Sequence, residues 1–228
     1  MTIKVYFHIC AIGHATKLVR EFIDAIHLSG LYDAIGLNGI YCCMSGGKDQ
    51  CTIIRDILKQ AGRKFIIAQE VPGDQSYERL TLSYARNTIQ PNDKALYIHT
   101  KSVSLTGNKL ANVMSWIRMM IYHLIKGHRE CIELLENNDV VGCNLHNNGG
   151  TCPYHFSGNF FWARGDYFAS LPEEIGPDYY APEFYVCRSG PRAVSLHDSN
   201  VNHYDCNYSY DRYVDSDSDI KSIRKMKL

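Results

Sequence analysis

A histidine and a lysine follow directly on a segment with the pattern of a buried strand. Residues 95–98 read Ala-Leu-Tyr-Ile, and His99, Thr100 and Lys101 come next. A lysine ammonium is a compact positive charge, and an imidazole can donate or accept a hydrogen bond, so the pair suits a phosphate ligand. An isolated polar triplet at a strand end would be interpreted as solvated side chains. Its meaning therefore depends on where the strand ends in the fold.

Strand-like and helical segments alternate through the first half of the chain. Apolar strand patterns are expected at residues 4–12, 35–43, 64–69 and 94–98, with amphipathic helical spacing between them at 16–28, 49–61 and 77–89. This alternation predicts an α/β fold with a mostly parallel, Rossmann-like central sheet flanked by helices. Ligands bind outside the carboxyl ends of the strands in such sheets. We therefore expect His99 and Lys101 at a binding edge.

Composition narrows the classes of function. The 228 residues carry no net charge, which argues against nucleic acid as the main partner. The sequence has no signal-peptide pattern and no apolar run near the ~20 residues of a membrane span, so we expect a cytoplasmic protein without a membrane span. The nine cysteines include no Cys-x-x-Cys pair, which disfavours a structural zinc site and favours reduced thiols.

Three further segments resemble one enzyme family. Ala85-Arg86-Asn87 precedes the strand quoted above, and "FSGNFFWA" (156–163) and "PEFYV" (182–186) follow it. In this order they resemble GT-A glycosyltransferases, in which Ala-Arg-Asn on a helix is followed by a strand and an Asp-x-Asp that holds a divalent metal on the donor diphosphate. Here His99-Thr100-Lys101 stands in its place. This form is similar to a subgroup found in bacteria and in large DNA viruses, which would place a viral member in the host cytoplasm.

The resemblance covers about residues 1–190 and implies a reaction. A hexose would pass from a nucleoside-diphosphate sugar, by default UDP-glucose or UDP-galactose, to a hydroxyl of a glycan or glycoprotein. Negative charge grows on the leaving diphosphate and must meet a positive group. We predict that Lys101 supplies this charge, so that no metal is required; the alternative is a Mn or Mg ion.

The resemblance also implies site residues. The predicted donor-binding residues are His8, Ala11, Ile12, Thr81, Arg86, His99, Thr100 and Lys101. The predicted sugar and acceptor residues are His155, Asn159 and Trp162. For the general base of an inverting transfer we place Glu183 first and include Asp178, with Lys101 as the catalytic cation. We assign residues 1–206 to one GT-A-like domain and residues 207–228 to a peripheral tail or linker.

Two other functions stay open at this point. The missing Asp-x-Asp is compatible with a non-catalytic module that binds a nucleotide sugar or a carbohydrate. His197, Asp198 and His203 could instead serve a metal-dependent hydrolase, although their spacing matches no strong ligand motif.

Overall fold

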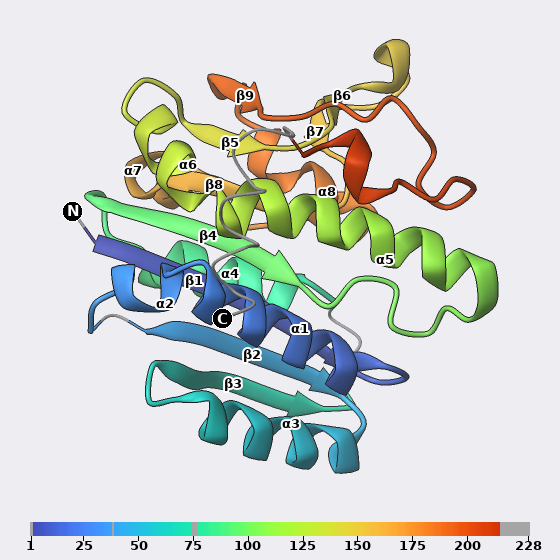
Figure 1. Cartoon of the computed structure of the whole chain (residues 1–228). Helices are drawn as coiled ribbons and strands as arrows, with labels where there is room; N and C mark the ends of the chain where they lie inside the picture. Colours follow the sequence, from blue (N-terminus) through green and yellow to red (C-terminus); the bar gives the residue numbers. More distant parts are fainter. Residues whose placement is uncertain (1, 38, 74–76, 215–228) are drawn as a thin grey trace, which may run out of the picture.

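The computed structural model describes residues 2–37, 39–73 and 77–214 and shows a central sheet covered by helices on both faces (Figure 1). Its strand order is β3-β2-β1-β4-β8-β5-β9. The strands are β1 (Thr2–Ala11), β2 (Ile40–Gly46), β3 (Phe65–Pro72), β4 (Asp93–His99), β5 (Val140–Gly142), β8 (Phe161–Arg164) and β9 (Ala193–Ser195). Only β8 runs antiparallel to its neighbours in this sheet, among the described residues. A mostly parallel α/β sheet in a single domain is thus confirmed.

The helices form one layer on each face of the sheet. They are α1 (Ala15–Leu28), α2 (Leu31–Ala34), α3 (Lys48–Ala61), α4 (Arg79–Thr88), α5 (Gly107–Ile121), α6 (His128–Leu134), α7 (Gly165–Ser170) and α8 (Ala181–Phe184). A π-helical turn, Tyr122–Lys126, joins α5 to α6, and short 3₁₀ turns span Asn148–Gly150, Tyr185–Cys187 and Tyr210–Arg212. A separate antiparallel pair joins β6 (Leu145–His146) to β7 (His155–Phe156).

Alternation along the strands decides which side chains meet which layer. Val5, Phe7 and Ile9 of β1 face the core under α1, α3 and α5. Tyr6 of β1 and Tyr97 of β4 face the opposite core, which contains α4 and α7. The side chains that β1 and β4 direct to this second face therefore reach the first turn of α4 at the carboxyl edge of the sheet.

The carboxyl ends of β1 and β4 are level with each other. His8 and His99 are partners in the parallel register. Beyond them, the Thr100 N–H donates to the His8 carbonyl at 3.0 Å, and Thr100 Oγ1 accepts from the Cys10 N–H at 2.8 Å. Thr100 therefore links the carboxyl ends of β1 and β4 through two hydrogen bonds, so its side chain has a structural role.

Two sequence predictions need correction. The second strand begins at Ile40, because Gly36 and Gly39 have φ of +62° and +86°, outside the extended region. The domain boundary at residue 206 does not match the packing. Tyr208 and Tyr213 are 4% and 8% exposed, and the Tyr208 N–H donates to Ser115 Oγ of α5 at 2.8 Å. The rest of the predicted tail, residues 215–228, lies outside the described residues.

None of the helices in the described ranges is long and apolar enough to cross a membrane.

Candidate functional site

His99 is the centre of a polar cluster at the carboxyl edge of the sheet. Its side chain is buried, with Nε2 2.9 Å from the Gly158 carbonyl. A carbonyl only accepts, so Nε2 carries the proton. Burial, reinforced by the nearby Lys101 charge, lowers the pKa of His99 to about 3. The ring is therefore neutral at physiological pH, and Nδ1 presents a lone pair.

Glu78 faces that lone pair from the position just before α4. Its Oε1 lies 3.6 Å from His99 Nδ1. Its Oε2 accepts from the Tyr97 hydroxyl at 3.0 Å and from Asn159 Nδ2. Burial raises the pKa of Glu78. Glu78 therefore joins His99, Tyr97 and Asn159, and it fixes Tyr97 and Asn159 in position by accepting their hydrogen bonds.

Glu183 approaches the cluster from α8. Its Oε1 accepts from the Gly158 N–H at 3.1 Å, and its side chain is half-buried. Gly158 therefore contacts both Glu183, through its N–H, and His99, through its carbonyl. A Cβ on Gly158 would lie 2.7 Å from Met120 Sδ and 2.9 Å from the Trp116 ring, and its φ is +96°. Only glycine fits this position without displacing both side chains.

Lys101 supplies the positive charge of the cluster. Its Nζ lies 4.6 Å from the centroid of the Trp116 ring. Its charge lowers the pKa values of His99 and Glu78, which places it within electrostatic reach of both. No carboxylate of residues 2–37, 39–73 or 77–214 forms an ion pair with it. Within the described structure, the ammonium is thus available to an anionic ligand. We call Glu78, His99, Lys101, Asn159 and Glu183 the β4-end cluster.

Four other predicted donor-binding residues, His8, Ala11, Ile12 and Thr81, lie near the β4-end cluster. His8 Nδ1 and Thr81 Oγ1 are 2.9 Å apart, and both side chains are buried. They join β1 to α4 underneath the cluster. Ala11 is fully buried, whereas Ile12 is 40% exposed in the turn that leads to α1. Of these four, Ile12 alone presents substantial side-chain surface to a ligand.

Arg86 does not join the cluster, contrary to the sequence prediction. It lies in the last turn of α4, roughly 12 Å along the helix axis from Glu78. Its Nε donates to the Leu171 carbonyl at 2.9 Å, after α7. The helix runs back from the carboxyl edge of the sheet, so its C-terminal residues approach the opposite edge. The Ala85-Arg86-Asn87 segment therefore does not contact the strand-end loop.

The prediction that Trp162 contacts the sugar is also wrong. Trp162 is 0% exposed in β8, and its Nε1 donates to the Leu124 carbonyl at 2.8 Å. It packs in the core on the α5 face of the sheet. A side chain with no accessible surface offers no face to a sugar.

Asp178 and His155 lie beside the cluster and take no part in its hydrogen bonds. Asp178 is exposed and uses its backbone carbonyl to accept from Arg79. His155 is buried in β7, with Nδ1 3.0 Å from the Pro153 carbonyl and its ring against Phe184. Among the predicted acceptor residues, only Asn159 contacts the cluster.

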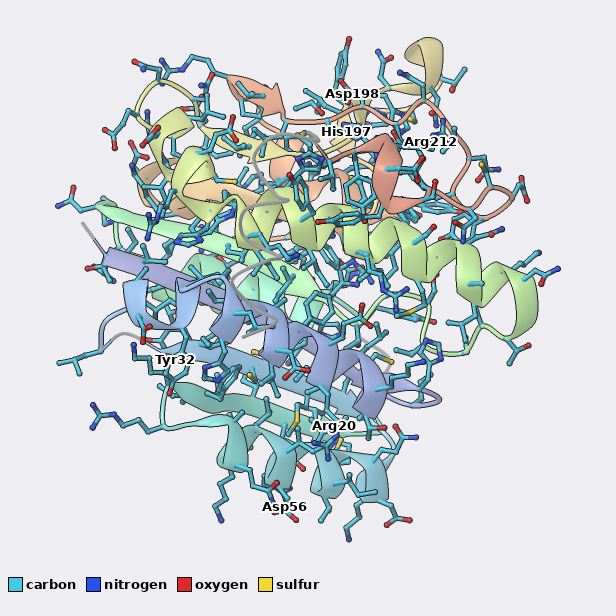
Figure 2. All side chains as sticks on the ribbon, viewed as in Figure 1. Arg20, Tyr32, Asp56, His197, Asp198 and Arg212 are labelled. Carbon is cyan, nitrogen blue, oxygen red and sulfur yellow. The ribbon has the colours of Figure 1, made fainter. Side chains whose placement is uncertain are left out.

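The residues proposed for a hydrolase are engaged in other contacts. His197 Nε2 is 2.7 Å from the Tyr208 hydroxyl, and His203 Nε2 is 2.7 Å from Ser199 Oγ. Figure 2 shows His197 and Asp198 in the upper half of the view, near the segment that carries Arg212. Within the described ranges, no group of three or more His, Cys, Asp or Glu residues is arranged to hold a metal ion. This geometry does not support the hydrolase.

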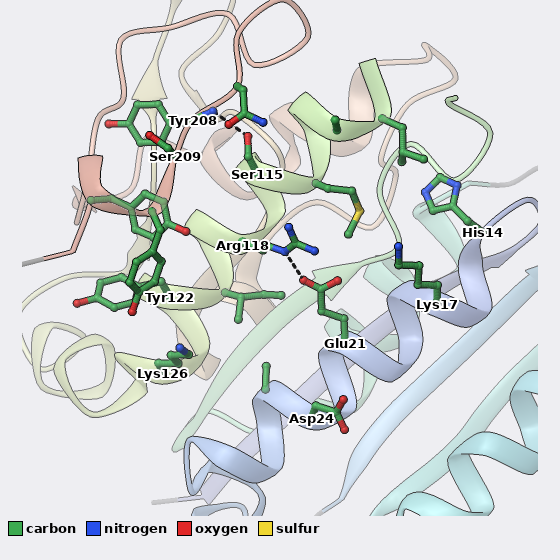
Figure 3. A pocket seen from close by; sticks show the side chains of 18 of the residues that line it. His14, Lys17, Glu21, Asp24, Ser115, Arg118, Tyr122, Lys126, Tyr208 and Ser209 are labelled. Atoms are coloured by element: carbon green, nitrogen blue, oxygen red, sulfur yellow. Dashed lines mark hydrogen bonds and ion pairs between the residues drawn. The ribbon is translucent and has the colours of Figure 1, made fainter. Parts of the chain in front are cut away.

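Two cavities of similar size lie on either side of α5. One, of about 760 Å³, is lined by Trp116, Ser157 and the loop 198–204. The other, of about 730 Å³, separates α1 from α5. Figure 3 shows Glu21 and Arg118 facing each other across this second cavity, joined by an ion pair of 2.8 Å. The second cavity contains no residue of the β4-end cluster, whereas the first adjoins it at Ser157 and Trp116.

Comparisons with known proteins give little further direction. No protein-family model matches the sequence. No curated protein matches it either. Among solved structures, 4-diphosphocytidyl-2C-methyl-D-erythritol synthase from Anaerococcus prevotii aligns over 100% of this chain and 99% of its own, with 10% identity and a TM-score of 0.49. A likeness this distant says nothing about substrate or reaction.

Proposed function

We propose that this chain is a glycosyltransferase that moves a hexose from a UDP-hexose, UDP-glucose or UDP-galactose, to a hydroxyl of a glycan or glycoprotein without a metal ion. The supporting observation is Lys101. It lies within electrostatic reach of Glu78 and His99 at the carboxyl edge of a mostly parallel sheet, and no described carboxylate forms an ion pair with it. This edge is where α/β sheets bind their ligands.

The leaving diphosphate requires a positive partner. When the bond between the anomeric carbon and the phosphate oxygen breaks, its electron pair stays on the phosphate. Lys101 can stabilise this charge through its ammonium. A divalent metal, which the resembling family uses, fits the residues present poorly. Mg²⁺ and Mn²⁺ favour several oxygen ligands, and the strand end offers a neutral imidazole and an ammonium beside the carboxylates of Glu78 and Glu183. Among the described residues, no three ligating side chains are arranged around one point. Glu78 Oε2 already accepts from Tyr97 and Asn159.

Glu183 is the better placed of the two carboxylates to act as a base. Only its Oε1 is engaged by a described residue, through the Gly158 N–H. In an inverting transfer, the acceptor hydroxyl would give its proton to this carboxylate. The acceptor oxygen would form the new bond to the anomeric carbon, and UDP would leave. His99 and Glu78 would hold the Gly158–Asn159 turn in place.

Hydrolysis of the donor by water tests the proposal without knowledge of the acceptor. A panel of UDP- and GDP-sugars would be incubated with the protein in EDTA and with added manganese. We expect one UDP-hexose to be cleaved in EDTA, and Lys101→Ala to lower kcat about 100-fold or more. Lys109→Ala, which removes an exposed lysine of α5, is the matched control and should retain activity.

Two results would refute the proposal. Activity that depends on manganese would show that Lys101 does not replace the metal. Binding of UDP without turnover, even with a panel of glycoside acceptors present, would favour a non-catalytic nucleotide-sugar module on the same fold.

A further inference from the structure

We infer that the 760 Å³ cavity beside α5 is a binding pocket for a neutral saccharide, which presents its hydroxyl to the β4-end cluster. Its role as the acceptor pocket rests on the proposed glycosyl transfer. Saccharide binding itself does not, and can be measured separately. The volume falls within the roughly 300–1,000 Å³ that is usual for ligand pockets.

The lining is polar and nearly uncharged. Four asparagines line it, Asn144, Asn148, Asn200 and Asn202, and Asp198 is the only charged residue in the described lining. The amides of Asn144 and Asn202 are engaged at both ends within the protein, so the amides of Asn148 and Asn200 are the ones left for a ligand. Amides both donate and accept, so they match the hydroxyls of a sugar. An anionic ligand such as a nucleoside diphosphate would meet no lysine or arginine there. The composition therefore favours a neutral polyol.

Hydrogen bonds fix these groups before any ligand binds. Asn144 Oδ1 accepts from the Ser199 N–H at 2.7 Å and from its hydroxyl at 2.9 Å. Asn200 Nδ2 donates to the Asp198 carbonyl at 3.2 Å, which orients its amide and leaves its Oδ1 without a described partner. Ordered polar groups lower the entropic cost of binding.

An aromatic ring borders the same cavity. Tyr204 is 41% exposed and lies edge-on to Trp116 at 5.9 Å between ring centroids. Trp116 is itself covered, because the His203 ring stacks on it at 4.7 Å. Tyr204 is thus the aromatic surface available to the apolar C–H face of a sugar.

The pocket adjoins the β4-end cluster at two places. Ser157 lines the pocket and is bonded to Gly158, whose N–H and carbonyl contact Glu183 and His99. The Trp116 ring lines the pocket and also contacts Lys101 Nζ. Since consecutive Cα atoms are about 3.8 Å apart, a sugar against Ser157 would lie one residue from the cluster.

Ligand-observed NMR tests the binding without any donor. Methyl glycosides of glucose, galactose, mannose and N-acetylglucosamine, with lactose and maltose, would be titrated into the protein. We expect at least one to bind, and Tyr204→Ala to weaken its affinity about fivefold or more. Asn200→Gly should have a similar effect, and glycine tolerates the φ of +56° at this position. Tyr210→Ala is the matched control, because Tyr210 is 42% exposed and lies outside the pocket.

Assays of donor cleavage and glycosyl transfer then distinguish a failure of the saccharide pocket from a failure of the proposed function. If a glycoside binds and responds to Tyr204→Ala and Asn200→Gly while no donor is cleaved, the pocket stands and the transferase fails. If a donor is cleaved, the ratio of transfer to hydrolysis should fall in both pocket variants and stay constant in Tyr210→Ala. The inference is overturned if no glycoside binds at millimolar concentration, or if binding is equal in all three variants.

Discussion

The β4-end cluster contacts Trp116 through Lys101, and a group of three histidines contacts it through His203, yet the two groups differ in how their polar side chains are held. Carboxylates and an ammonium gather in the β4-end cluster. The second group, His123 of the π-helical turn with His197 and His203 of the following loops, packs its rings against other rings instead. His203 stacks on Trp116, and His123 lies 4.9 Å from His197 at 15°. We call these three residues the histidine group.

The two groups differ in the contacts and in the charge of their buried side chains. In the histidine group, burial lowers the pKa of His123 and of His203 to about 4, so both rings are neutral and their partners are hydroxyls or aromatic faces. In the β4-end cluster, Lys101 keeps a charge that no described ion pair cancels. By residue type alone, both groups are candidates for a functional site. The contacts of their side chains favour only the β4-end cluster, because the histidines are neutral and packed against other groups.

The largest expected effect is the loss of transfer in Glu183→Gln. The amide oxygen of glutamine can still accept from the Gly158 N–H, so the fold should survive, but the proposed base is gone. We expect kcat for transfer to fall about 100-fold or more, measured at saturating donor. The control Glu173→Gln changes an exposed carboxylate and should retain activity. Wild-type transfer by Glu183→Gln would remove this residue from the mechanism.

In the histidine group, the strongest effect should be on stability. Ser199→Ala removes the hydroxyl that contacts His203 Nε2 and donates to Asn144 Oδ1 in a buried setting. The free energy of unfolding should fall by about 1–3 kcal/mol in chemical denaturation. Ser170→Ala, at an exposed serine of α7, should change it much less. Equal effects of the two variants would mean that the buried network adds no stability.

The pH dependence of stability should report the neutral histidines. Because the pKa of His123 is about 4 in the folded chain, the unfolded chain binds the extra proton between pH 6.5 and 4. Stability is therefore complete above pH 6.5 and falls with decreasing pH, by up to about 1.4 kcal/mol per pH unit for this group. His123→Phe should reduce the slope by that amount. Identical slopes in the two proteins would contradict a buried neutral ring.

The smallest effect should be on the stability of Glu78→Gln. Burial raises the pKa of Glu78, so the folded chain holds its proton at a pH where the unfolded chain has lost it. Wild-type stability therefore declines as pH rises from 4.5 through the folded pKa, whereas glutamine mimics the protonated form at every pH. The variant should therefore become more stable relative to wild type as pH rises from 4.5, in chemical denaturation at a series of pH values. A constant difference across this range would place the proton elsewhere.

The sequence was enough to predict the central sheet and the location of His99 and Lys101 at its carboxyl edge. It did not reveal the contacts between residues that are distant in the sequence. The alternation of strands and helices was enough to place His99 and Lys101 at the carboxyl edge. Glu78 could not be identified, because nothing local signals its contact with His99 across residues 79–98. Arg86 was wrong because a helix of ten residues carries its last turn away from the site. Trp162 was wrong because an aromatic residue in an inner strand fits a core as readily as a sugar.

Gly158 has a consequence for how this molecule could diversify. One residue without a side chain contacts the imidazole through its carbonyl and the carboxylate through its N–H. A change that moves the Gly158 backbone would disturb both groups at once, and any larger residue would collide with Met120 and Trp116. Exposed positions of the lining such as Asn200 and Tyr204 can therefore change one at a time, whereas the contacts of Gly158 with Glu183 and His99 can change only together.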